Sequence, residues 1–195
     1  MQYLKEEVRN RILASAKQEF LEQGYKNASI RNIAELAKTS LGNIYRYFID
    51  KEALFLAVTN NLIEAGVVLF ETNFSLSEQD LAVFPDKVLD YVLAYRQELA
   101  IVKSGLKEHF DSYIEALIEV TAKKFSLSMQ RIYPQVATNF GRDFYYNMSA
   151  SFLFGLRTVI DCDKHRAEKK QGLRELIWFF FSNIDKRFNF FEALD

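Results

Sequence analysis

The stretch Ser29–Phe48, SIRNIAELAKTSLGNIYRYF, decides the fold of the N-terminal part of the chain. Its pattern predicts a short helix, a three-residue turn and a second short helix, with Ser29 and Ser40 placed to cap the two helices. The two helices share an apolar seam, formed by Ile30, Ile33, Ala34, Ala37, Ile44 and Phe48. This is the layout of a helix-turn-helix.

The second helix of the pair has the outward face that entry into a DNA groove requires. A helix enters the major groove only when its outward face is small or polar and its inward face anchors it. Asn43 can hydrogen-bond a base edge, and Tyr45 can reach a base or a phosphate. Arg31, in the preceding helix, can approach a guanine or the backbone, and Lys51, in the first turn of the next helix, can meet a phosphate. The residues expected to face outward or to flank the groove are Leu41, Gly42, Asn43, Tyr45, Arg46 and Tyr47.

Residues Arg9–Phe55 resemble the DNA-binding region of the TetR/AcrR family of transcriptional regulators. The matching residues are Ile12–Leu13, Ala16, Phe20, Gly24–Tyr25, Ser29–Ile30, Ile33–Ala34, Ala37, Ser40, Ile44–Tyr45, Tyr47–Phe48 and Lys51–Phe55. The resemblance implies that Arg31, Leu41, Gly42, Asn43 and Tyr45 face bases and that Tyr47 and Lys51 face phosphates. The complete predicted DNA-binding set is Ser29, Arg31, Ser40, Leu41, Gly42, Asn43, Tyr45, Tyr47 and Lys51. Arg46 is interpreted as a solvated flank.

The chain departs from the family pattern in the turn of this motif. The family usually has glycine where Lys38 stands and a small aliphatic residue where Thr39 stands. A residue other than glycine in a left-handed turn costs about 1 kcal/mol. Lys38 is therefore expected either to strain the turn or to add a phosphate contact.

Composition indicates a globular protein with a slightly basic N-terminal part. Apolar residues make up 49% and charged residues 26% of the chain, and the net charge is -1. Residues 1–51 carry nine Lys and Arg against six acidic residues, a net charge of +3, which suits an anionic partner at one end. The single cysteine, Cys162, excludes an intrachain disulfide and suits a reducing compartment. Because the sequence has no apolar signal core and no uninterrupted apolar run of roughly 18 residues, we expect a cytoplasmic protein that spans no membrane.

Apolar spacing predicts an all-α fold, a helical bundle preceded by a small helix-turn-helix domain. We expect a DNA-binding domain over 1–50 and a ligand-binding and dimerisation domain over 51–195. The first helix carries the stripe Leu4, Val8, Ile12, Ala16 and Phe20 and ends at Gly24, and a later helix is capped by Asp50. Thr72–Asp80 reads as a loop, and Pro85 as the first turn of the helix that follows. The remaining predicted helices are Gln97–Gly105, Lys107–Tyr133 (ended by Pro134), Gly141–Cys162 and Glu168–Phe191.

The aromatic residues of the last two predicted helices have two possible functions, a dimer interface or an effector pocket. Two helices per subunit that pair into a four-helix bundle need apolar residues on more than one face, which favours a homodimer interface. The predicted interface residues are Phe144, Met148, Phe152, Gly155, Ile177, Phe180, Ile184 and Phe188. The alternative is a pocket for a small apolar or aromatic effector, with the sparse polar lining Tyr91, Tyr95, His109, Tyr113, Asn147 and Arg157.

These observations predict a dimeric, ligand-responsive repressor of a near-palindromic operator. An effector bound between Thr72 and Pro134 would change the spacing of the two recognition helices through the Asp50–Glu71 helix. Asp161, Asp163 and His165 alternate in a predicted loop, and we predict neither a metal site nor a cofactor. We also predict no enzyme, because no glycine-rich phosphate loop, nucleophile motif or acid pair occurs. The alternatives are a helical ligand-binding or scaffolding protein with a decayed DNA-binding domain, and a membrane-surface protein that uses the aromatic C-terminal helices.

Overall fold

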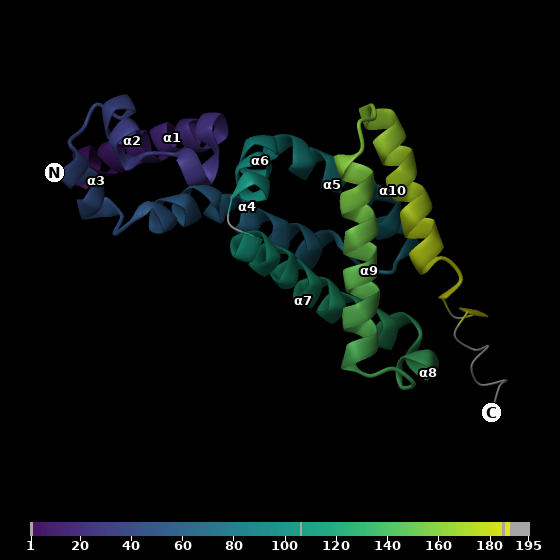
Figure 1. Cartoon of the computed structure of the whole chain (residues 1–195). Helices are drawn as coiled ribbons and strands as arrows, with labels where there is room; N and C mark the ends of the chain where they lie inside the picture. Colours follow the sequence, from purple (N-terminus) through teal and green to yellow (C-terminus); the bar gives the residue numbers. More distant parts are fainter. Residues whose placement is uncertain (1, 106, 185, 188–195) are drawn as a thin grey trace. The chain divides into compact units, whose positions relative to one another are not determined.

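The computed structural model describes residues 2–105, 107–184 and 186–187, and in these ranges the regular secondary structure is helical (Figure 1). The predicted all-α fold class is confirmed. In chain order the helices are α1 (Gln2–Asn27), α2 (Ile30–Leu36), α3 (Leu41–Tyr47), α4 (Lys51–Asn73), α5 (Glu78–Ala94), α6 (Arg96–Ser104), α7 (Lys107–Ile132), α8 (Pro134–Ala137), α9 (Arg142–Asp161) and α10 (Arg166–Phe181).

The chain divides into two units by the contacts within it. The first, here called the N-terminal unit, comprises residues up to 65 together with 94–113, and the C-terminal unit comprises 66–93 and the residues from 114 onward. The first unit is therefore discontinuous in sequence. The division into functional domains at residue 50 stays a prediction.

The core of the N-terminal unit forms on the stripe that the sequence predicts for α1. Ile12, Ala16 and Phe20 are fully buried. The ring of Phe20 lies 5.7 Å from that of Phe55 on α4, and Tyr25 lies 5.0 Å from Phe55, both edge to face. Aromatic pairs of this geometry stabilise a core by about 0.5–1.5 kcal/mol each beyond their area burial. This cluster joins the end of α1 to α4.

Helix α6 completes the N-terminal unit from a later part of the chain. It packs against α1 and buries Ile101 and Val102. The Lys17 ammonium of α1 lies 2.6 Å from a carboxylate oxygen of Glu98 on α6, and both side chains are mostly buried. An apolar contact and an ion pair therefore hold α6 to α1.

Gly24 ends the first helical segment of α1, as predicted, and one further helical turn follows it. The helix continues to Asn27, but Gly24 has φ 69° and ψ 163°, which are not helical values. Only glycine adopts a positive φ of this kind without a steric cost at Cβ. The predicted end of the helix at Gly24 is thus a kink followed by one more turn.

An aromatic core fills the C-terminal unit. The Phe181 ring of α10 lies 5.3 Å from Phe74, 5.5 Å from Phe125 and 5.0 Å from Phe152. A Cβ atom at Gly155 of α9 would come within 2.7 Å of the Leu176 side chain of α10. Gly155, which the sequence analysis predicts as an interface residue, therefore allows a close approach of α9 and α10 within the same chain.

The predicted start of the fifth helix is wrong. α4 extends to Asn73 and α5 begins at Glu78, so Pro85 lies inside α5 and not in its first turn. The reason is a serine cap: the Ser77 hydroxyl accepts from the Asp80 backbone N–H at 3.1 Å and donates to the Asp80 carboxylate at 2.6 Å. Ser75 donates to the same carboxylate. A good cap at Ser77, five residues after the start of the predicted loop, outweighs the proline signal.

The last two helices match their predicted starts better than the predicted end. α9 has Gly141 and Cys162 as its caps, as expected. α10 begins at Arg166, where the Glu168 carboxylate accepts from the His165 backbone N–H at 3.2 Å, and ends at Phe181. Asn183 has a φ of 50°, which interrupts the helical path well before the predicted end. Phe188 and Phe191 lie outside the described residues.

Helix α4 combines length with high hydropathy. An 18-residue window of it has a mean hydropathy of 1.8, so by length and composition alone it is able to cross a membrane. Within the chain, however, Leu54, Phe55 and Leu62 on this helix are fully buried. Because 33% of that window is buried, the expectation that no segment spans a membrane stays a prediction.

The α5 cap predicts a pH-dependent contribution to stability. The hydroxyls of Ser75 and Ser77 hold the pKa of the Asp80 carboxyl below its ordinary value. A lowered folded-state pKa gives stability that is present above the unfolded pKa, near 4, and is lost as the pH falls through the folded pKa. Ser77→Ala should therefore lower the free energy of unfolding by about 1 kcal/mol at pH 7 and by less at pH 3, in denaturant titrations. Gln79→Ala, exposed in the same turn, is the control, and equal losses at both pH values would contradict the assignment.

Candidate nucleic-acid interface

Serine side chains begin both helices of the helix-turn-helix, as predicted. The Ser29 hydroxyl accepts from the Arg31 backbone N–H at 3.2 Å, at the start of α2. The Ser40 hydroxyl accepts from the Asn43 backbone N–H at 3.1 Å, at the start of α3. Asp50 caps α4 in the same way, accepting from the Ala53 N–H at 2.7 Å. Local capping thus sets where each helix begins.

The turn between α2 and α3 is left-handed at Lys38, which has a φ of 51°. The Thr39 N–H donates to the Ala34 carbonyl and the Lys38 N–H to the Glu35 carbonyl, both at 3.0 Å. This pair of bonds is the Schellman motif, which usually has glycine at the position of Lys38. The structure therefore keeps the turn geometry of the motif with a residue that is strained in it.

Helix α3 is held by one face and leaves the other open. Ile44 is fully buried and Phe48, its C-cap residue, is nearly so, which confirms both as anchors. On the opposite face Tyr45 is 51% and Leu41 39% exposed. Of the other predicted DNA contacts, Arg31, Ser40 and Gly42 are exposed, while Ser29, Asn43 and Tyr47 are half-buried. The outward face of α3 is thus small, polar and aromatic.

Asn43 has a partner that the sequence analysis does not foresee. Its side-chain N–H donates to the Thr39 hydroxyl at 2.8 Å. The bond fixes the rotamer of Asn43 and joins α3 to the strained turn. Thr39 therefore orients a predicted base contact, which explains why a hydroxyl there is useful where the family has an aliphatic side chain.

Lys51 is turned toward the protein. Its ammonium donates to the backbone carbonyls of Tyr25 at 2.8 Å, Lys26 at 3.2 Å and Ala28 at 3.1 Å. It also lies over the Tyr25 ring, 4.7 Å from the centroid. An ammonium group has three N–H donors, so these carbonyls account for all of them. The Lys51 side chain is thus bonded to the protein backbone, whereas Arg31 is exposed.

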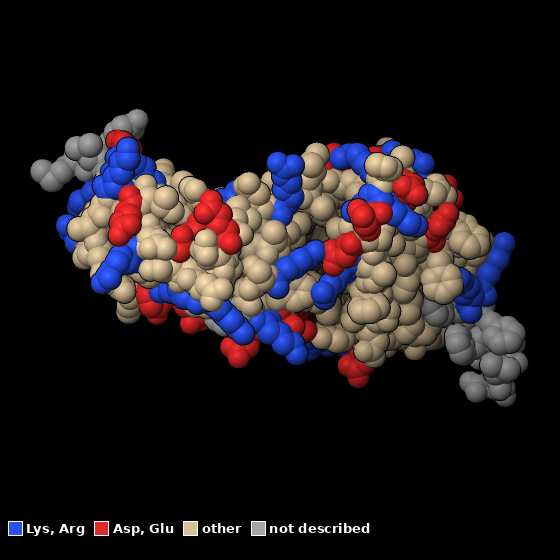
Figure 2. All heavy atoms as spheres, turned by 45° about the horizontal axis from the view of Figure 1, so that its top comes forward, with Lys and Arg blue, Asp and Glu red and all other residues tan. Residues whose placement is uncertain are grey.

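One face of the molecule carries no broad area of a single charge. On the face shown in Figure 2, basic and acidic side chains are interspersed. This agrees with a net charge of -1 for the whole chain.

Two of the residues predicted to bind an effector line a cavity in the N-terminal unit. The cavity has a volume of about 150 Å³, and its wall includes His109, Tyr113, Thr59 and Ser112 with apolar residues of α4 and α6. The His109 Nε2 atom lies 3.2 Å from a Glu52 carboxylate oxygen. Polar groups thus share the wall of this partly open cavity with the apolar side chains of Phe55, Leu56, Ile63 and Val102.

The other predicted effector residues do not line this cavity. Tyr91 and Tyr95 are half-buried, Asn147 is exposed, and Arg157 is exposed with its Nε atom 3.4 Å from Asp161. The six predicted residues are therefore not brought together at one site. The prediction that they bind an effector stays a prediction, with His109 and Tyr113 the pair that shares a cavity.

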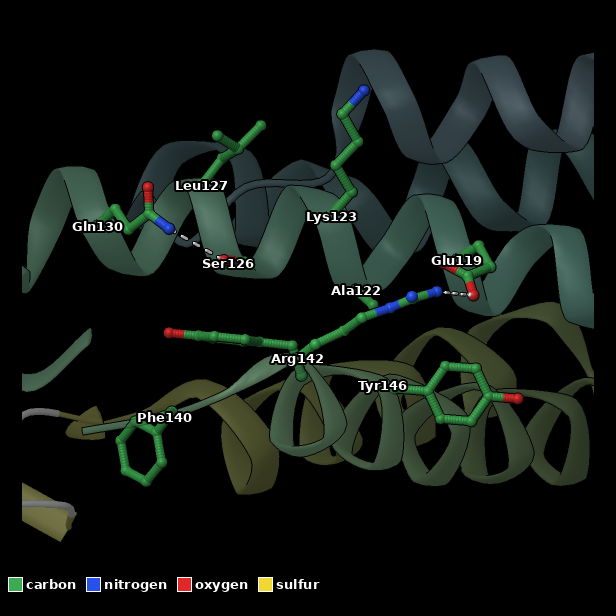
Figure 3. Close-up of a pocket in the computed structure, with 10 residues that line it drawn as sticks. Glu119, Ala122, Lys123, Ser126, Leu127, Gln130, Phe140, Arg142 and Tyr146 are labelled. Carbon is green, nitrogen blue, oxygen red and sulfur yellow. Dashed lines mark hydrogen bonds and ion pairs between the residues drawn. The ribbon is translucent and has the colours of Figure 1, made fainter. Parts of the chain in front are cut away.

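A larger, more polar groove of about 520 Å³ lies between α7 and α9 in the C-terminal unit (Figure 3). Arg142 extends from α9 to Glu119 on α7, with 2.9 Å between guanidinium and carboxylate, and Gln130 donates to Ser126. A hydrogen bond to the Glu115 carboxylate raises the pKa of Tyr146. The groove's charged groups are thus paired with one another or point outward, as Lys123 does in Figure 3.

The predicted interface residues divide into two groups. Phe152, Ile177 and Ile184 are buried in the core of the C-terminal unit, where they pack within the chain. Phe144, Met148, Gly155 and Phe180 are half-buried, and Phe188 lies outside the described residues. The large apolar side chains exposed on α9 and α10 are instead Phe154, Trp178 and Phe179, at 72%, 67% and 59%. The dimer interface itself stays a prediction.

Metal binding has no support among the described residues. No group of three or more His, Cys, Asp or Glu side chains in residues 2–105, 107–184 and 186–187 is placed to hold an ion. Asp161, Asp163 and His165 are exposed around the connection between α9 and α10.

Sequence comparison matches this part of the chain to known regulators. Residues 12–58 match the family model "Bacterial regulatory proteins, tetR family". The transcriptional regulator HbdR of Aromatoleum is 41% identical over 61 residues, which cover 31% of this chain and 27% of HbdR. The transcriptional repressor AcnR of Corynebacterium diphtheriae is 32% identical over 80 residues, or 40% of this chain and 42% of AcnR. The chain thus matches less than half the length of these relatives.

Structural comparison extends the likeness to nearly the whole chain. A transcriptional regulator of this family from Aquifex aeolicus has a TM-score of 0.67 at 22% identity, covering 89% of this chain and 99% of the other. A TetR-like transcriptional regulator from Rhodococcus has a TM-score of 0.65 at 16% identity, with 90% and 96% covered. At this identity the likeness shows the fold.

Fold and site together define an all-helical protein whose N-terminal unit carries a helix-turn-helix with an outward-facing second helix. Residues 12–58 match the TetR-family model, and the fold of nearly the whole chain is similar to that of TetR/AcrR-family regulators.

The strained turn yields a test of its geometry. Lys38→Gly should raise the free energy of unfolding by about 0.5–1 kcal/mol, because glycine adopts the positive φ without the Cβ penalty. Part of that gain is lost, since glycine also increases the conformational entropy of the unfolded chain. Denaturant titration measures the change. Lys38→Ala removes the charge but keeps Cβ, so it should give no such gain; if both variants were equally stabilised, loss of charge and not relief of strain would be the cause.

Proposed function

We propose that this protein is a sequence-specific DNA-binding transcriptional regulator that binds its operator through α3 as a homodimer. The observation that carries the proposal is the fixed, outward-facing α3, anchored by Ile44 and Phe48 and presenting Tyr45, Leu41 and Gly42. The relatives that match this region are named as transcriptional regulators and repressors. We propose repression, because a dimer that covers an operator occludes a promoter, and we place the protein in the cytoplasm with no enzymatic activity.

In this proposal the residues of the interface have two kinds of role. Tyr45, Asn43 and Arg31 contact base edges in the major groove and set the sequence preference. Ser29, Ser40 and Tyr47 approach the phosphates, which position the helix without reading sequence. Contacts of the second kind make affinity depend steeply on salt concentration.

Tyr45 offers the clearest test of base reading. Selection of bound sequences from random duplex DNA should recover one near-palindromic motif, and Tyr45→Ala should weaken binding to that motif by about 1–3 kcal/mol while leaving non-specific binding unchanged. Fluorescence anisotropy on the selected and a scrambled duplex measures both. Arg46→Ala, exposed on the same helix, is the control. Equal losses on both duplexes for Tyr45→Ala would remove its base-reading role, and recovery of no motif by a folded protein would favour the decayed-domain alternative.

The dimer is proposed to form through exposed aromatic side chains of α9 and α10. Phe154, Trp178 and Phe179 lie on helices that pack against each other. Large apolar side chains left open on two adjoining helices are typical of a surface that another helix pair covers. The ring of the half-buried Phe180 lies 5.4 Å from that of Phe179. This surface replaces the buried residues Phe152, Ile177 and Ile184 in our proposal.

A charge placed on that surface should disrupt the dimer. Phe154→Arg should raise the dimer dissociation constant by at least about tenfold, because burying an unpaired guanidinium is strongly unfavourable. Sedimentation velocity over a concentration series measures it. Val83→Arg, on the exposed side of α5, is the matched control. A Phe154→Arg protein with an unchanged dissociation constant would exclude this surface, and liposome binding by the unaltered protein would favour the membrane-surface alternative.

We propose that the cavity around His109 and Tyr113 takes the effector. Its volume of about 150 Å³ fits a molecule of one aromatic ring. Its apolar wall suits such a ring, and His109, Thr59 and Ser112 lie where one hydroxyl or similar group would meet them. Residues of α4 line the cavity, so occupancy would favour conformers that differ in the α4 helix next to the helix-turn-helix.

Filling the cavity tests the effector proposal. Phenol is the probe: it should raise the midpoint of thermal unfolding and weaken operator binding of the unaltered protein. Val102→Phe, which fills the cavity, should abolish both effects and keep operator binding. Leu93→Phe, at an exposed position on α5, is the control substitution. Phenol effects that persist in Val102→Phe would place the effector elsewhere.

A further inference from the structure

One peptide group joins α1 to α2, and charged side chains hold it from both ends. This is the peptide between Ala28 and Ser29. Its N–H donates to a carboxylate oxygen of Glu19 at 3.0 Å. Its carbonyl oxygen accepts from the Lys51 ammonium at 3.1 Å. The acidic residue, Glu19, lies on α1, and the basic residue, Lys51, is the first residue of α4.

The acidic end of this arrangement is buried. Glu19 is only 3% exposed, and the same carboxylate oxygen also accepts from the Asn32 side-chain N–H of α2 at 3.3 Å. A buried charge is unfavourable unless hydrogen bonds and an opposite charge compensate for it. Both of its donors belong to the start of α2, so the carboxylate serves to fix that helix to α1.

The basic end closes the last turn of α1. Besides Ala28, the Lys51 ammonium binds the carbonyls of Tyr25 and Lys26, which lie beyond the kink at Gly24. Carbonyls at the end of a helix have no helical donor and carry the negative end of its dipole, so a cation there is favourable. The Lys51 side chain thereby ties the start of α4 to the segment that leads into α2.

We infer that Glu19 and Lys51 act together as positioning residues that fix the plane of the Ala28–Ser29 peptide, and with it the start of the helix-turn-helix. The two charges polarise the peptide in the same sense, so each strengthens the other's hydrogen bond. Ser29 is the N-cap of α2, and rotation of its peptide would move the cap and Arg31 beyond it. Lys51 thus acts on DNA binding through the protein and not through a phosphate. This inference about DNA rests on the proposed function.

Salt dependence of operator binding separates the two roles of Lys51. A residue that contacts a phosphate contributes about 0.9 to the slope of log affinity against log salt concentration, and its removal lowers that slope. Lys51→Met should instead weaken operator binding by about tenfold at every salt concentration and leave the slope as it is in the control. The control is Lys26→Met, which removes a charge from the same exposed segment without touching the carbonyls. A slope lower than the control's by about 0.9 would overturn the inference.

A second measurement is independent of DNA. In the unaltered protein the Ser29 amide should be protected from hydrogen exchange, measured by NMR, and both Glu19→Gln and Lys51→Met should increase its exchange rate at least about tenfold. The double variant should lose less than the sum of the two single losses in free energy of unfolding, because the residues act through one peptide. Additive losses with an unchanged Ser29 exchange rate would overturn the inference. These two measurements need no DNA, so they test the positioning role of Glu19 and Lys51 even if the protein binds no operator. Failure of the proposed function is therefore distinguishable from failure of this inference.

Discussion

The short helix α3 depends on the burial of two side chains, Ile44 and Phe48. An isolated helix of seven residues is unstable in water, because nucleation is costly and few hydrogen bonds follow it. Its place is fixed by apolar contact with the core that α1 and α2 form, and its start by the Ser40 cap. Everything proposed about its outward face follows from this anchoring, since a side chain reads DNA only when the helix beneath it has one orientation.

The sequence predicts best what is determined locally. Ser29, Ser40 and Asp50 cap their helices as expected, because the cap and its amide are two or three residues apart. The turn conformation of Lys38 is predictable for the same reason. Glu19 gives no such signal, since its partners are ten and thirteen residues away and an acidic residue within a helix is usually solvated. The clue in the sequence is the position of Glu19, a charged residue next to Phe20 at the buried side of α1.

Predictions from the sequence are wrong mainly where residues far away in the sequence determine the burial or the partners of a side chain. Apolar spacing identifies the face of a helix but not what covers it, so Phe152 and Ile184 read as interface residues although the chain's own core buries them. Lys51 matches a family position and yet faces three backbone carbonyls. The wrong start predicted for α5 differs in kind, because the Ser77–Asp80 cap is local and the prediction follows Pro85, a residue usual in a first turn. Burial and partner choice, unlike capping, require the fold.

The discontinuity of the N-terminal unit limits how the protein can be cut. A fragment that stops at residue 65 keeps the helix-turn-helix but lacks 94–113, and with it Ile101 and Val102 of the core and the Glu98 partner of Lys17. The helix-turn-helix is therefore not a self-contained module. A chimera that takes it from this chain would have to include α6 as well.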